Sequence, residues 1–151
     1  MDGGRPDSRI LDFIRSHHVM ALAVTDGEEP WSAPVFYSFD PVTLNFYFLT
    51  FEETRHAATA FANPQVSASI FDQQRSIPDV RGLQLSGLAE WVVGEEALVA
   101  RAAYDEFFPE ARGMAAPLWR IEPFYFKLTD NRLGFGAKIE WSRRLNMPIG
   151  S

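Results

Sequence analysis

Two threonines and two basic residues between Thr50 and His56 have the side chains that a phosphate-binding site needs. Thr54 stands directly before a run that favours a helix, where its hydroxyl can cap the first turn. The N-terminus of a helix presents unpaired N–H groups and a partial positive charge, and both stabilise a bound phosphate. Arg55 and His56 would add a guanidinium and an imidazole to the same turn. The segment is not a P-loop, because the chain has no glycine-rich stretch that ends in Gly-Lys-Ser or Gly-Lys-Thr.

The same residues also allow a purely structural interpretation. Thr54 would then be an N-cap and nothing more, and Arg55 and His56 would lie on a solvated helix face. Elsewhere, His17 and His18 are poor joint metal ligands, because adjacent residues point to different sides of a helix. The chain has no HExxH pattern and no cysteine, so the sequence predicts no metal site. It also singles out no side chain as a catalytic acid, base or nucleophile.

Alternating apolar and polar residues indicate that the phosphate motif follows a strand and precedes a helix. Leu44, Phe46 and Phe48 form the apolar half of that alternation. We expect six strands, at 19–25, 31–39, 44–48, 66–70, 81–93 and 118–129, with Gly87 as a bulge or a point of close approach. We expect helices that begin at Asp7 or Ser8, after Thr54 and at Glu95, and a glycine-containing tail over 130–141.

These elements predict a mainly β fold with peripheral helices. The strands are not separated by regular helices, so the chain lacks the alternation of strands and helices that is typical of a parallel α/β sheet. A six-stranded antiparallel barrel fits the pattern best. No linker or internal repeat divides the chain, so we expect a single domain over residues 1–151 with a loose tail at 1–6.

The composition narrows the class of protein. A 46% hydrophobic content in 151 residues is enough for a packed core, and the net charge of -6 argues against nucleic acid as a partner. Without cysteine there is no disulfide, zinc thiolate or cysteine nucleophile. No apolar run reaches the roughly 18 residues of a membrane span, and the first residues lack the apolar core of a signal peptide. We therefore expect a cytoplasmic protein that does not bind a membrane.

The order of the elements, with threonines and basic residues after the third strand, resembles the FMN-binding split-barrel superfamily of pyridoxamine 5'-phosphate oxidase. The likeness covers residues 10–126. Three segments also resemble a small group of uncharacterised bacterial proteins within that superfamily: 54–57, 80–84 with Gly87, and 129–136, which contains Thr-Asp-Asn and then Leu-Gly-Phe-Gly. Both likenesses imply a six-stranded split barrel that forms a homodimer, with two cofactor sites at the subunit interface.

The resemblance also implies which residues bind the cofactor. In flavin-binding members, the segment that matches 32–36 follows the flavin ring through its backbone, which implies contacts at Ala33 and Val35. Gln84 matches a glutamine of the fifth strand, and this position implies a polar contact to the flavin or its ribityl chain. The segment that matches 50–56 binds the phosphate, which assigns this role to Thr50, Thr54, Arg55 and His56.

One of these positions departs from the family pattern. His56 stands where the family usually has a lysine, counting back from Asn63 and Pro64. Arg55 could supply the missing charge, because a guanidinium binds phosphate through two parallel hydrogen bonds.

The leading functional hypothesis is an FMN-binding flavoprotein, and if it is an enzyme, an oxidoreductase whose substrate the sequence does not identify. The flavin would supply the redox chemistry. A second hypothesis is a non-catalytic module of the same fold that binds a flavin, haem or a deazaflavin. A third is a dimeric interaction protein that has lost the cofactor. The departure at His56 favours the second and third hypotheses, and Thr50, Thr54, Arg55 and Gln84 favour the first.

Overall fold

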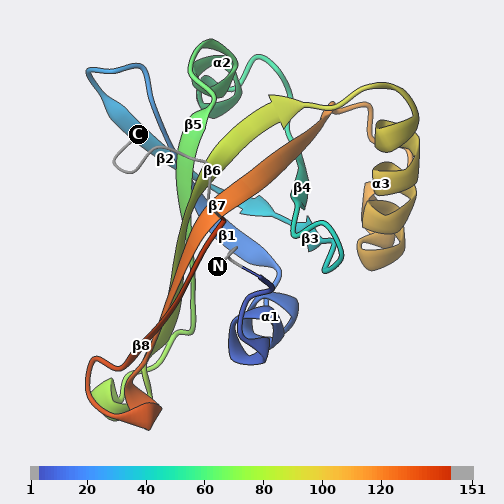
Figure 1. The fold of residues 1–151 in the computed structure, drawn as a ribbon. Helices are drawn as coiled ribbons and strands as arrows, with labels where there is room; N and C mark the ends of the chain where they lie inside the picture. Colours follow the sequence, from blue (N-terminus) through green and yellow to red (C-terminus); the bar gives the residue numbers. More distant parts are fainter. Residues whose placement is uncertain (1–3, 144–151) are drawn as a thin grey trace.

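The computed structural model describes residues 4–143, which form a strongly curled antiparallel sheet with three α-helices around it (Figure 1). The helices are α1 (Ser8–Arg15), α2 (Arg55–Ala62) and α3 (Gly94–Phe107). The strands are β1 (Val19–Thr25), β2 (Pro30–Phe36), β3 (Ser38–Phe39), β4 (Phe46–Leu49), β5 (Gln65–Phe71), β6 (Arg81–Trp91), β7 (Leu118–Asp130) and β8 (Lys138–Ser142). The predicted mainly β class with peripheral helices is confirmed.

The strand order is β2-β1-β5-β6-β7-β4-β3, and β8 pairs with β7. The long strands β6 and β7 bend where Gly87 lies opposite Pro123, and the register shifts there. A Cβ atom on Gly87 would lie 2.3 Å from the carbonyl oxygen of Glu122, so only glycine fits this close approach. The bulge or close approach that we expected at Gly87 is therefore confirmed.

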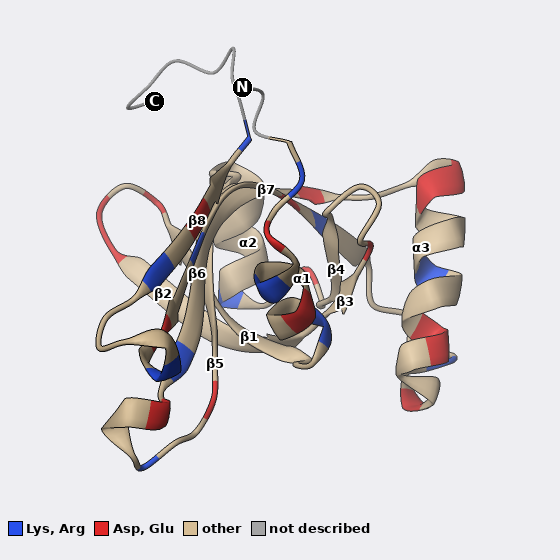
Figure 2. Ribbon diagram, turned by 60° about the horizontal axis from the view of Figure 1, so that its bottom comes forward, with Lys and Arg blue, Asp and Glu red and all other residues tan. Residues whose placement is uncertain are grey.

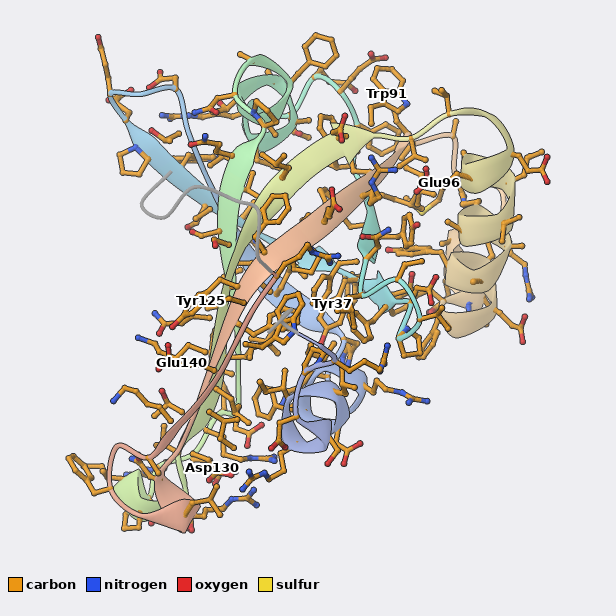
Figure 3. All side chains as sticks on the ribbon, viewed as in Figure 1. Tyr37, Trp91, Glu96, Tyr125, Asp130 and Glu140 are labelled. Carbon is orange, nitrogen blue, oxygen red and sulfur yellow. The ribbon has the colours of Figure 1, made fainter. Side chains whose placement is uncertain are left out.

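The expected strand 31–39 is in fact two strands that pair with different neighbours. β2 pairs with β1, whereas β3 pairs with β4, so the chain crosses the open side of the barrel at Tyr37. The phenol of Tyr37 points into the molecule (Figure 3) and donates a hydrogen bond to the carbonyl of Ile14 at 2.7 Å. This buried contact fixes the crossing and links it to α1.

Two further expectations about strands were wrong. Leu44 is not in a strand: it is a buried turn residue with φ of 71°, and its N–H donates to the carbonyl of Asp40 at 2.7 Å. Its apolar side chain packs in the core with Phe46 and Phe48. The spacing of the three residues therefore resembles that of one face of a strand, although Leu44 lies before the strand. The expected tail at 130–141 contains β8, which pairs with β7 along its length and buries Trp141. The sheet therefore has eight strands rather than six.

The helices begin where the sequence suggests. Asp7 is the N-cap of α1 and accepts a hydrogen bond from the N–H of Arg9 at 2.8 Å. The buried face of α1 closes one side of the barrel core with Ile10, Phe13 and Ile14. α3 begins at Gly94, with two glutamates in its first turn, and packs outside β4. None of the helices in residues 4–143 is long and apolar enough to cross a membrane.

Candidate functional site

The N-terminus of α2 brings together three of the predicted phosphate ligands. Thr50 follows β4 and is buried, and its Oγ1 lies 2.7 Å from Nε2 of His56 and 3.4 Å from Oγ1 of Thr54. Thr54 is the N-cap of α2, as predicted, and its hydroxyl oxygen accepts a hydrogen bond from the N–H of Ala57 at 3.2 Å. The first intrahelical bond runs from Ala58 N to Thr54 O at 3.0 Å. Two hydroxyls and an imidazole therefore converge at the positive end of a helix.

His56 carries no permanent charge at this position. Burial lowers the pKa of its imidazole below the ordinary value of 6.5, so the ring is neutral at pH 7. A neutral imidazole has one N–H donor and one acceptor nitrogen, and the Thr50 hydroxyl satisfies Nε2 in either role. The pair is a polar, uncharged contact where a lysine would place a full positive charge.

Arg55 makes its contacts on the other side of α2, with β2 and the loop before it. Its guanidinium carbon lies 4.0 Å from the centroid of the Trp31 ring, and its Nη2 lies 3.5 Å from Oε1 of Glu29. The cation–π contact and the long ion pair hold the guanidinium over the sheet edge. The structure therefore does not bring Arg55 together with Thr50 and His56. The contact between Arg55 and Trp31 was not predicted, because nothing in the spacing of the two residues along the chain relates them.

The three residues that we expected beside a flavin ring lie on the sheet rather than at α2. Ala33 and Val35 are on β2, paired with Leu22 and Met20 of β1, and the side chain of Val35 is buried. β2 is at the end of the strand order, so one side of its backbone has no neighbouring strand within the described residues. Gln84 is exposed in the middle of β6, between Ser69 of β5 and Lys127 of β7.

Gln84 lies on a surface that we call the outer face, formed by the outward-pointing side chains of β2, β1, β5 and β6. Most of these side chains are small: Ala21, Ala23, Ser32, Ser67, Ser69 and Ser86 accompany Gln84. Except for Ser86, they line a depression of about 350 Å³. In the sequence, this surface is indicated by the alternation of small residues with core residues along these strands.

A larger hollow of about 690 Å³ lies farther along the same strands, beside the turn between β1 and β2. Thr25 and Pro30 line it at the turn, Gln65 lines it from β5, and Leu88 and Phe124 line it from β6 and β7. No residue of this hollow was among the predicted site residues. Within residues 4–143, no group of three or more histidine or acidic side chains is placed to bind a metal ion.

Comparison with solved structures identifies the fold. A haem storage protein named HutZ from Vibrio cholerae has a TM-score of 0.67 and 21% identity over 79% of this chain and 90% of its own. A candidate pyridoxamine 5'-phosphate oxidase from Listeria innocua has a TM-score of 0.65 and 19% identity, covering 80% of this chain and 95% of its own. An FAD-binding protein from Mesorhizobium loti has a TM-score of 0.65 and 14% identity, covering 80% and 91%.

These likenesses confirm the split-barrel fold and the resemblance to the pyridoxamine 5'-phosphate oxidase superfamily. At such identities they establish the fold alone. The family follows from sequence. No family model matches the chain. However, a UPF0306 protein from Yersinia pseudotuberculosis is 36% identical over 140 residues, which are 91% of this chain and 95% of that protein. At this identity over nearly the whole length of both proteins, the chain belongs to the UPF0306 family.

Proposed function

We propose that this protein is a homodimeric flavoprotein that binds FMN and acts as an oxidoreductase. The observation that carries the proposal is the convergence of Thr50, Thr54 and His56 on the N-terminus of α2. The hydroxyls and the free first-turn N–H groups would bind the phosphate. The backbone at Ala33 and Val35 would lie along the ring, and Gln84 would make a polar contact from the neighbouring strands.

The residues at the N-terminus of α2 offer a phosphate several hydrogen-bond donors but little positive charge. Hydroxyls, a neutral imidazole and N–H groups supply hydrogen bonds, and the helix end supplies partial positive charge. Arg55 is 49% exposed at its side chain, and it would have to exchange Trp31 and Glu29 for the phosphate. The long, exposed ion pair with Glu29 contributes about 0–1 kcal/mol and the exposed contact with Trp31 about 0.5–1 kcal/mol, which is less than two charge-assisted hydrogen bonds to a phosphate would contribute. We therefore expect Arg55 to add the missing charge only when FMN binds.

A bound flavin would supply the redox chemistry, and the protein would hold and orient it. No acidic or basic side chain is assigned to proton transfer, since many flavin hydride transfers need none. The residues at α2 would anchor the cofactor through its phosphate. The hydrogen-bonding groups of the outer face would lie at the opposite end of the cofactor.

The test is a titration of the purified protein with FMN and with riboflavin, followed by flavin fluorescence. Phosphate recognition predicts that FMN binds at least tenfold more tightly, because charge-assisted hydrogen bonds each contribute about 1.5–3 kcal/mol. Arg55→Ala should remove roughly a ten- to hundredfold share of FMN affinity and leave riboflavin unaffected. Equal affinity of the wild-type protein for the two flavins would rule out the phosphate site. Bleaching of bound FMN by a nicotinamide donor would separate an oxidoreductase from a flavin store.

Haem is the second candidate, and a specific observation favours it. His56 offers a neutral imidazole at the site, which is the protonation state that binds iron. Relatives of the same fold include a haem storage protein. The absorption spectrum distinguishes the candidates, because haem gives a Soret band that flavin lacks. If His56 binds the iron, His56→Ala should abolish that band, whereas Thr50→Val should keep it. If the protein binds neither flavin nor haem, the third hypothesis remains: a dimeric interaction protein that has lost its cofactor.

A further inference from the structure

A groove lies between α3 and the hairpin that β3 and β4 form, and we call it the α3 groove. Its volume is about 480 Å³, which is in the range of pockets that bind small molecules. Figure 1 shows α3 beside β3 and β4. None of the residues that line the α3 groove belongs to the proposed FMN site or to the outer face.

The hairpin wall of the α3 groove is polar. Ser38 pairs with Tyr47 across the two strands, so the two side chains point to the same face of the hairpin. Asp40 and Asn45 lie two residues farther along, and the N–H of Asp40 donates to the carbonyl of Asn45 at 2.9 Å. Because side chains alternate along a strand, all four polar side chains line the groove, whereas the phenylalanines between them pack against the core.

The opposite wall is apolar and consists of one face of α3. Its apolar residues recur at helical spacing and are Val99, Ala100, Ala103 and Phe107. Val99 is 67% exposed and Phe107 is 66% exposed, so both leave apolar surface uncovered. Glu96, labelled in Figure 3, lies one turn earlier on this face, and its Oε2 accepts a hydrogen bond from the Tyr47 hydroxyl at 2.9 Å. This bond joins the two walls.

The hydroxyl of Ser38 indicates that the groove holds a polar group. Ser38 is only 6% exposed, yet its hydroxyl has no hydrogen-bond partner among residues 4–143. Buried hydroxyls normally have a partner, because burying one without a hydrogen bond costs free energy. Since Ser38 shares its face with Tyr47, whose phenol reaches α3, the Ser38 hydroxyl faces the groove. Its partner must therefore be solvent or a ligand in the groove.

Asp40 places an unpaired negative charge in the same wall. Its Oδ1 accepts a hydrogen bond from the N–H of Val42 at 2.9 Å, and Oδ2 has no partner among the described residues. Asp40 forms no ion pair within residues 4–143. Arg5 lies nearby in the fold, but its guanidinium donates to the carbonyl of Pro41 at 2.6 Å. The carboxylate of Asp40 is thus available to a ligand.

The helix wall also carries more negative than positive charge. Arg120 binds Glu96 at 2.7 Å and Glu90 at 2.9 Å, so one guanidinium serves two carboxylates. Asp40 and Glu96 are the charged side chains that line the groove, and both are acidic. Figure 2 shows further acidic residues, in red, at both ends of α3. This excess of negative charge beside an apolar wall favours the binding of an apolar cation.

We propose that the α3 groove binds a small organic cation, a protonated amine attached to an aromatic or aliphatic body. The ammonium group donates hydrogen bonds to Oδ2 of Asp40 and to the hydroxyl of Ser38, and the apolar body packs against Val99 and Phe107. An ammonium group has three donors and no acceptor, so it matches a wall of acceptors. A carboxylate or phosphate ligand does not fit, because Asp40 would repel it.

Two probes with the same apolar body test the sign of the charge. Tryptamine and indole-3-propionate share an indole ring but carry an ammonium and a carboxylate at pH 7. An NMR titration of the isotope-labelled protein gives the dissociation constant of each probe and the amide signals that move. Tryptamine should bind at least tenfold more tightly, with the largest shifts within 38–47 and 96–107. Equal affinities, or shifts centred elsewhere, would overturn the proposal.

Asp40→Asn isolates the role of the charge, because the amide oxygen can still accept the hydrogen bond from Val42. The variant should bind tryptamine roughly tenfold more weakly and indole-3-propionate no more weakly than the wild-type protein does. Asp79→Asn is the matched control, since it removes a charge from an exposed position outside the groove. If tryptamine binds Asp40→Asn as tightly as the wild-type protein, the assignment of Asp40 is wrong.

Ala103→Arg tests the helix wall, because a long cationic side chain fills the groove and repels an ammonium group. It should weaken tryptamine binding at least tenfold. Ala102→Arg is the matched control: this neighbouring residue is also exposed, but it does not line the groove. Equal losses in the two variants would contradict binding in the groove. Because the groove shares no residue with the FMN site, a wild-type protein that fails to bind FMN leaves this inference standing.

Discussion

At the scale of single residues, the most informative position is His56. Its hydrogen bond to Thr50 keeps the imidazole inside the proposed site, and burial keeps it neutral. His56→Lys should therefore tighten FMN binding roughly tenfold at pH 8, because a permanent charge replaces an uncharged donor. Flavin fluorescence titration measures this change. Riboflavin affinity is the control, and a gain for riboflavin as large as for FMN would show that the phosphate is not involved.

The sequence predicted the identity of the residues at α2 but not all of their contacts. A threonine before a helix fixes its own role through local geometry, so the N-cap at Thr54 was predictable. The hydrogen bond between Thr50 and His56 was not predicted, because it depends on how the end of β4 approaches α2. The position of Arg55 was not predictable, because it depends on Trp31, which lies far away in the chain and reaches α2 only through the curl of the sheet.

At the scale of elements, Gly87 is the residue that allows β6 and β7 to approach closely where their register shifts. Gly87→Ala would press a methyl group against the backbone of Glu122, because a Cβ atom at position 87 would lie 2.3 Å from the carbonyl oxygen of Glu122. We expect a loss of about 1–3 kcal/mol in the free energy of unfolding, as for other overpacked sites. Urea denaturation measures it. Gly82→Ala on the same strand is the matched control, because the nearest atom there lies at 3.7 Å and no strain is expected.

Asp72 couples α1 to the loop that follows β5. It accepts hydrogen bonds from the ring Nε2 of His17 and from Nε of Arg81, the latter at 2.7 Å. Burial by itself would raise the pKa of Asp72, but the bonds from His17 and Arg81 outweigh it and lower the pKa below 3.8. When folding lowers the pKa of a carboxylate, that carboxylate stabilises the folded protein at any pH above its pKa in the unfolded state. The stabilisation is lost as the pH falls through the pKa that the group has in the folded state.

Asp72→Asn should therefore lower the free energy of unfolding by about 1–3 kcal/mol at pH 7 and by much less near pH 2. Denaturation at a series of pH values gives the difference between the wild-type protein and the variant. Asp79→Asn, an exposed position in the same loop, controls for the change of residue type. A difference that does not shrink as the pH falls from 4 to 2 would mean that Asp72 acts through packing rather than charge.

Element types were more predictable than element partners. Strands with regular alternation and helices with an N-cap were recognised at nearly the right bounds, because both signals are local. The division of 31–39 at Tyr37 was not, because both halves continue the same alternation. Strand β8 was missed for a related reason: the glycines at 134 and 136 indicate a turn, and the strand after them is short and pairs only at the edge of the sheet.

At the scale of the whole molecule, we expect a two-fold dimer in solution. The exposed aromatic residues and the small side chains of the outer face would bury more than about 1,000 Å² in total, the area of a stable interface. Sedimentation at micromolar concentration should give twice the mass of one chain, and Ser69→Arg at the centre of the face should shift the equilibrium to monomer. Arg15→Glu, on α1, is the control with an equally large change of charge away from this face.

The position of β4 in the sheet has a consequence for how the chain is made. β4 pairs with β3 beside it in sequence and with β7, which comes much later and holds Phe46 opposite Ile121. On the ribosome, the apolar residues of β4 emerge well before the strand that covers them. The barrel cannot close until most of the chain has been synthesised, so the incomplete chain exposes Phe46 and Phe48 for that interval. A growing chain of this kind is a natural client for a chaperone that binds short apolar segments.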